Sequence, residues 1–153
     1  MALFVVRPAA DGGGQSEIVD GRALINQLLE CSEGRECARL LQTIKFPFRV
    51  PDSFVHPENR AIGEVVFAPV LATEPLIRFR YDSIIEGLEV HPQVDSKEAR
   101  WAIDYLRGAI ASAIDPVLAL KAGDLLLTNN HEILHGRTAF GSRNRLLIRV
   151  RIQ

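Results

Sequence analysis

Residues 122–151 read AGDLLLTNNHEILHGRTAFGSRNRLLIRVR, and this stretch decides the fold. Two runs in it have the length and apolar character of strands, at 124–128 and at 145–152. The second run alternates between two sets of side chains, which are Leu146, Ile148, Val150 and Ile152 on one side and Arg145, Leu147, Arg149 and Arg151 on the other. Successive side chains of a strand point to opposite faces, so this alternation directs most of the arginines to one face.

The N-terminal part predicts one strand and two helices. The apolar run 2–6 is followed by Pro8 and by a glycine cluster at 12–14, which is typical of a strand that ends in a tight loop. Asp20 is placed to cap a helix with apolar residues at helical spacing, and Gly34 marks the region where that helix should end. A second short helix is expected over 35–43.

The middle of the chain predicts strands and then a long helix. Five prolines between 46 and 79 interrupt short apolar runs, a pattern that favours edge strands and turns. The clearest helix begins at Asp95 or Ser96, where Asp95 and Glu98 have capping-box spacing, and it ends before Pro116. The expected fold class is therefore α+β, in one domain that covers 1–153.

Composition narrows the classes of partner. The chain has 153 residues, 47% hydrophobic and 24% charged, with a formal net charge of -1. Such a balance gives no general field toward nucleic acid or an anionic membrane, so neither is expected as a partner. The apolar run at the N-terminus is too short to span a membrane. Cys31 and Cys37 lack the spacing of a zinc site and are expected to be reduced thiols in a cytoplasmic protein.

The C-terminal end is strongly basic. No carboxylate follows Glu132, whereas five arginines do, at 137, 143, 145, 149 and 151. This asymmetry suits a small anionic ligand. The alternative is a solvated basic edge strand, and Arg143 and Arg151 are expected to face solvent.

The segment from His131 to His135 satisfies the HExxH pattern of zinc hydrolases. That pattern needs a helix, but a strand-like run and two asparagines precede it and Gly136 follows it. No His, Asp or Glu downstream of His135 can supply a third ligand. A zinc hydrolase therefore remains a minor alternative.

Three pieces of the chain resemble the taurine dioxygenase and clavaminate synthase-like family of iron(II)- and 2-oxoglutarate-dependent oxygenases. The segment 2–7 followed by Gly13-Gly14-Gln15-Ser16 is similar to the family's strand and Gly-Gly-x-Thr/Ser loop. The segment 122–130 with Leu134-His135-Gly136-Arg137 looks like the Gly-Asp strand and the distal metal histidine. The segment 145–149 resembles the family's Arg-x-x-x-Arg strand.

The resemblance implies a partial double-stranded β-helix, or jelly roll, with flanking helices. It implies that His135 is an iron ligand, that Ser16 and Arg145 hold the far carboxylate of 2-oxoglutarate, and that Arg149 serves its near end. Such iron sites use two histidines and one carboxylate and leave positions open for co-substrate and oxygen. Arginine pairs with carboxylates bidentately, which suits the co-substrate.

The substrate implied by the resemblance is a small molecule, an amino acid or another small acid. It would be hydroxylated or desaturated while 2-oxoglutarate loses carbon dioxide. Arg80 and Asp82 lie in an expected strand-to-turn stretch where they could line the mouth of a pocket; an exposed charged strand is the alternative. Asp124 is expected to be a turn carboxylate.

The chain departs from the family in its metal ligands. The family's His-x-Asp or His-x-Glu pair precedes the strand that corresponds to 3–6 and would here fall before Met1. His56 and His91 lie in the wrong part of the motif order to replace it. We therefore expect a truncated chain, inactive alone, whose unpaired strand edges favour self-association. A remnant, or a partner of a complementing N-terminal segment, are alternatives. A non-catalytic module that binds an anion is the rival function.

Overall fold

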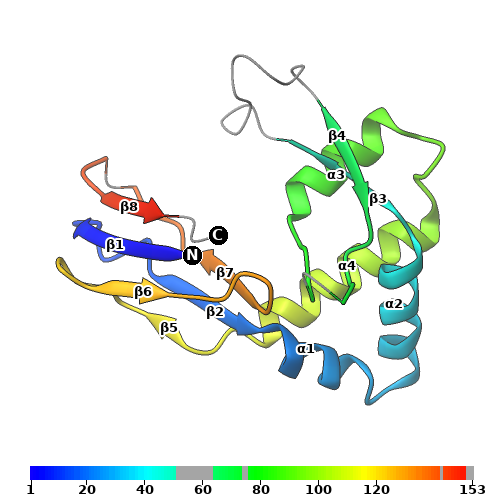
Figure 1. Cartoon of the computed structure of the whole chain (residues 1–153), viewed down its shortest axis with the longest axis horizontal. Coiled ribbons are helices and arrows are strands. Elements are labelled where there is room, and N and C mark those ends of the chain that lie inside the picture. Colours follow the sequence, from blue (N-terminus) through cyan, green and yellow to red (C-terminus); the bar gives the residue numbers. More distant parts are fainter. Residues whose placement is uncertain (51–63, 74–75, 142, 151–153) are drawn as a thin grey trace.

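The computed structural model describes residues 1–50, 64–73, 76–141 and 143–150. The helices are α1 (Gly21–Leu28), α2 (Ser32–Thr43), α3 (Tyr81–Val90) and α4 (Lys97–Ser112). The strands are β1 (Ala2–Arg7), β2 (Ser16–Asp20), β3 (Phe46–Arg49), β4 (Val65–Ala68), β5 (Val117–Leu118), β6 (Leu125–Leu127), β7 (Ile133–Arg137) and β8 (Leu146–Val150). The predicted α+β class is confirmed (Figure 1).

Two three-stranded antiparallel sheets lie together on one side of the molecule (Figure 1). One has the order β6-β1-β8 and the other the order β5-β2-β7. The segments 1–20 and 117–150 therefore interleave, since each central strand comes from the N-terminal end and both of its neighbours from the C-terminal end. The hairpin of β3 and β4 lies with the helices on the other side.

The main core lies among the helices and this hairpin. Its fully buried side chains include Leu41 of α2, Ile84 of α3, Ile103 of α4 and Phe46 of β3. Val19 of β2 belongs to the same core. At roughly 1.5 to 3 kcal/mol for each large apolar side chain buried, this core holds β2 in a defined place.

Helix ends follow the predicted caps. The Asp20 carboxylate accepts from the backbone N–H groups of Arg22 and Ala23, at 2.8 and 3.1 Å, so it caps α1 as expected. Of the two residues considered for the long helix, Ser96 is the cap of α4, and its hydroxyl accepts from the N–H of Ala99 at 3.1 Å. Asp95 instead pairs with Arg100.

Several expectations about the elements were wrong. Gly34 does not end the first helix: α1 ends at Leu28, and Gly34 lies inside α2 with the carbonyl of Leu28 against it. The stretch around Arg80 to Asp82 is not strand and turn, because α3 begins at Tyr81. Gly87, a poor helix former, obscures this helix in the sequence, and packing against β3 stabilises it.

The expected β-rich middle is confirmed in part. β3 and β4 pair from Phe46–Ala68 to Arg49–Val65, and Leu71 forms a bridge with Ile77. Residues 51–63, including His56, lie outside the described part of the chain. Three strands that no local pattern predicted are β2, β5 and β7.

The two faces of the β6-β1-β8 sheet differ. Leu3 and Val5 on the inner face are buried. The opposite face carries apolar side chains that are between 38% and 62% exposed, namely Phe4, Val6, Leu125, Leu127, Leu146, Ile148 and Val150. The apolar half of the alternating C-terminal strand thus faces outward, and Arg145, Leu147 and Arg149 face the other sheet side.

Cys31 and Cys37 are free thiols, as predicted, the first exposed and the second buried. Burial raises the pKa of the Cys37 thiol to about 11, so this thiol is un-ionised at neutral pH. Among the described helices, none combines the length and the apolar character that a membrane span requires.

Candidate functional site

Ser16 and His135 come together through the pairing of β2 with β7. His135 is opposite Ile18 in the register, and Ser16 is opposite Arg137, so all four side chains share one face of the sheet. The His135 Nε2 atom lies 3.3 Å from the Ser16 Oγ atom, and Ser16 is 1% exposed. A buried hydroxyl therefore fixes the imidazole of a half-buried histidine.

Arginine charges surround this histidine. Burial lowers the pKa of His135 below its ordinary value, and the charges of Arg145, Arg149 and Arg137 lower this pKa further. All of these causes disfavour the imidazolium. The neutral imidazole has a free lone pair, which is the form that binds metals.

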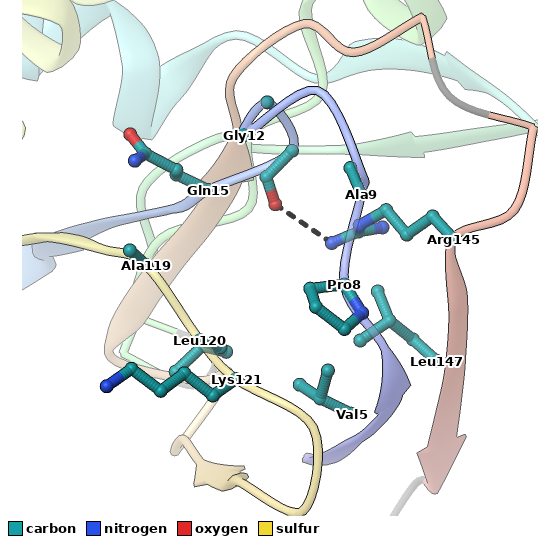
Figure 2. A pocket seen from close by; sticks show the side chains of 12 residues that line it. Val5, Pro8, Ala9, Gly12, Gln15, Ala119, Leu120, Lys121, Arg145 and Leu147 are labelled. Carbon is teal, nitrogen blue, oxygen red and sulfur yellow. Dashed lines mark hydrogen bonds between the residues drawn. The ribbon is translucent and has the colours of Figure 1, made fainter.

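Arg145 stands at the start of β8 and reaches back to the glycine loop after β1. Its Nη2 atom donates to the carbonyl oxygen of Gly14 at 3.0 Å, shown by the dashed line in Figure 2. Burial lowers the pKa of Arg145, with a smaller contribution from the charge of Arg137. The same guanidinium borders a cavity of about 180 Å³ between the glycine loop and residues 119–121 (Figure 2).

Two larger cavities, of about 620 and 680 Å³, meet at His135. Both are lined by Arg80, His135, Gly136 and Arg149. The 620 Å³ cavity also has Arg137 and Arg145 in its wall. Among the described residues that line it there are four arginines and no carboxylate, so this cavity suits an anion with more than one charged group.

The two weaker candidates for substrate binding are separated. Arg80, the residue before α3, borders both large cavities. Asp82 lies in the first turn of α3, is exposed and lines none of these three cavities. Only the arginine is therefore placed to contact a ligand there.

The described residues do not complete an iron site. Within 1–50, 64–73, 76–141 and 143–150, no group of three His, Cys, Asp or Glu side chains can hold a metal ion. His135 supplies one imidazole, whereas iron(II) sites of this kind need three protein ligands. His91 lies elsewhere, beyond the end of α3, with its ring against Phe67.

The HExxH segment has the wrong geometry for a zinc hydrolase. Residues 133–137 form strand β7, so His131 and His135 are not one helical turn apart. The Glu132 carboxylate pairs with Arg22. The minor zinc interpretation is therefore wrong for this segment.

The other polar residues near the C-terminus have structural roles. Asp124 accepts from the backbone N–H of Lys121 at 2.7 Å, as expected of a turn carboxylate. Arg143 is exposed, and Arg151 lies outside the described residues. Two residues that the pattern of arginines and motifs did not single out are Arg137 and Phe140, which both border the 620 Å³ cavity. Their position directly after His135 was the available signal.

Comparison with known proteins places this geometry in a family. The model of the taurine catabolism dioxygenase TauD, TfdA family matches residues 1–151. The comparison with curated proteins gives no match.

Solved structures of oxygenases have a similar fold. An asparagine oxygenase in complex with Fe(II), 2S,3S-3-hydroxyasparagine and succinate has a TM-score of 0.71 at 21% identity, over 95% of this chain and 42% of that one. The non-heme iron oxygenase OrfP in complex with Fe, succinate and (3S)-hydroxy-L-Arg has a TM-score of 0.56 at 20% identity, over 95% and 41%. The chain thus spans about two-fifths of the length of these structures.

Proposed function

We propose, from the premise that this chain belongs to the TauD and TfdA dioxygenase family, that it forms the co-substrate-binding part of an iron(II)- and 2-oxoglutarate-dependent oxygenase. The observation that supports this most directly is the cavity beside His135, which four arginines line and no described carboxylate enters. A dicarboxylate such as 2-oxoglutarate is the ligand whose charge this wall complements.

Each candidate residue has a role in this proposal. Arg145 and Ser16 hold the far carboxylate of 2-oxoglutarate, and Arg149 serves its near end. His135 is one iron ligand. The metal and co-substrate together supply the oxidising chemistry in such enzymes, but the described residues provide a single ligand, so no step of a reaction is assigned to this chain.

The architecture supports a partial double-stranded β-helix. Strands β5, β6, β7 and β8 alternate between the two three-stranded sheets, as in a jelly roll wound from paired strands. We propose that residues 1–153 are the C-terminal part of one such domain, in the cytoplasm. The exposed apolar face of the β6-β1-β8 sheet and the edge strand β7 are where a complementing segment or a second copy would pack.

The proposed substrate is an amino acid or another small acid. Arg80 supports this, because it borders both cavities that meet at His135 and can pair with a carboxylate. Hydroxyasparagine and hydroxyarginine in the similar solved structures agree with a ligand of this size.

Calorimetric titration of the chain with 2-oxoglutarate, without metal, tests the co-substrate assignment. Arg145→Ala is expected to weaken binding at least about tenfold, because a hydrogen bond to a charged group contributes roughly 1.5–3 kcal/mol. Arg143→Ala is the matched control, since Arg143 is exposed and borders none of the three cavities. Equal binding by Arg145→Ala and the unchanged chain would refute the assignment.

The incomplete metal site favours a second candidate, a non-catalytic module that binds an anion. The same titration with iron(II) under anaerobic conditions separates the two. Higher affinity for 2-oxoglutarate with iron indicates a functional metal site, whereas an unchanged affinity indicates the module. Stoichiometric succinate production by the chain alone would show that further metal ligands lie among its other residues.

A further inference from the structure

Two loops on either side of Arg145 are joined by hydrogen bonds. The first loop is 11–15, between β1 and β2, and the second is 138–141, between β7 and β8. Gln15 and Thr138 exchange two bonds, from the Gln15 N–H to the Thr138 Oγ1 atom at 2.9 Å and from the Thr138 N–H to the Gln15 carbonyl at 3.0 Å. The Gly141 N–H donates to an Asp11 carboxylate oxygen at 2.7 Å. The loops therefore form one rigid unit rather than two independent turns.

Two glycines allow this close approach. A Cβ atom on Gly13 would lie 2.4 Å from the carbonyl oxygen of Ala139. Gly14 has a φ of +67°, and a Cβ atom there would lie 2.9 Å from the Arg145 Nε atom and 3.3 Å from the Phe140 ring. Both positions thus require glycine, because the second loop and Arg145 occupy the space of a side chain.

Phe140 lies between two guanidinium groups. The Cζ atoms of Arg137 and Arg145 are each 5.0 Å from the centroid of its ring. Both distances are within the range of cation–π attraction. The ring therefore attracts two cations that repel each other, and it stabilises their presence in one cavity wall.

We propose that Phe140 is a positioning residue, whose ring and the Gly14 carbonyl hold the Arg145 guanidinium in the orientation that binds a carboxylate. This inference rests on the proposed function, in which Arg145 binds 2-oxoglutarate. The physical reason is preorganisation: a long side chain that is already fixed loses less conformational freedom when the ligand binds. Phe140 acts through Arg145 and needs no contact with the ligand.

The test is the affinity of the full chain for 2-oxoglutarate. Phe140→Leu is expected to weaken binding about fivefold, because it removes the ring but keeps an apolar side chain. Phe140→Tyr is expected to restore the affinity, because it keeps the ring. Phe4→Leu is the matched control, since Phe4 is 40% exposed on the opposite face of the sheet. If Phe140→Leu does not fold, Phe140→Met replaces it.

A second readout reports on the guanidinium without ligand. The ring current of Phe140 displaces the NMR resonance of the Arg145 Hε proton, and Phe140→Leu is expected to shift this resonance while Phe140→Tyr leaves it in place. Equal affinity of Phe140→Leu and the unchanged chain, together with loss of binding in Arg145→Ala, would overturn the positioning role alone. Equal affinity in both variants would overturn the proposed function instead.

Discussion

The His135 imidazole and the Ser16 hydroxyl lie 3.3 Å apart, although 119 positions separate them in the chain. The pairing of β2 with β7 brings them to one face, and the helical core behind Val19 fixes β2. This contact joins a candidate metal ligand to a candidate co-substrate ligand. Its disturbance should therefore affect both stability and ligand binding.

Ser16→Ala is expected to lower the free energy of unfolding by about 1 kcal/mol, because a buried hydrogen bond is lost and the imidazole keeps no hydroxyl partner. Urea denaturation followed by circular dichroism measures the change. Ser112→Ala is the control, since its hydroxyl is exposed and bonds only to the carbonyl of Gly108 in the same helix. A similar loss in both variants would contradict a special role for Ser16.

The protonation of His135 should make stability depend on pH. Because its pKa in the folded state is lowered from the ordinary 6.5, the unfolded chain binds the proton more readily. The free energy of unfolding is therefore expected to fall as the pH falls below about 6.5, until the folded state is protonated too. Denaturation midpoints between pH 8 and 5, compared with those of His135→Gln, measure this contribution.

Arg149→Gln provides the electrostatic control for that prediction. Removing this positive charge is expected to raise the pKa of His135 toward 6.5, because the charge of Arg149 lowers it. NMR titration of the imidazole gives the midpoint directly. An unchanged midpoint would mean that burial accounts for the whole shift.

Gly87→Ala and Gly108→Ala should have opposite effects. A Cβ atom on Gly87 would lie 1.9 Å from the carbonyl oxygen of Pro47, so α3 would have to move away from β3. The expected loss is roughly 2 to 3 kcal/mol. No atom lies within 4 Å of a Cβ on Gly108 in α4, where alanine should raise stability by roughly 0.5–1 kcal/mol. Thermal unfolding of both variants checks the pair.

The cap of the long helix gives a further prediction. Ser96→Ala is expected to cost about 1 kcal/mol, because the N–H of Ala99 loses its acceptor. Ser96→Asp should retain most of the stability, since aspartate caps equally well. Equal melting temperatures for the alanine and aspartate variants would show that the cap contributes little.

The sequence by itself determined the elements whose signals are local. Helix α4 has its cap and its apolar face within sixteen residues, and β8 shows its alternation within five. Helix α3 was missed because Gly87 weakens its local signal, and the reason for that glycine is the Pro47 carbonyl, forty positions earlier. Residue types also indicated an anionic ligand, because five arginines follow the last carboxylate.

Only the tertiary structure decided which of these residues meet. It placed Arg80 beside His135 and left Asp82 exposed, although the two are neighbours in the sequence. It also brought Phe140 against Arg145 and Arg145 against Gly14, 131 positions away. Pairing between distant strands depends on the packing of the whole chain, so no local pattern of side chains specifies those contacts.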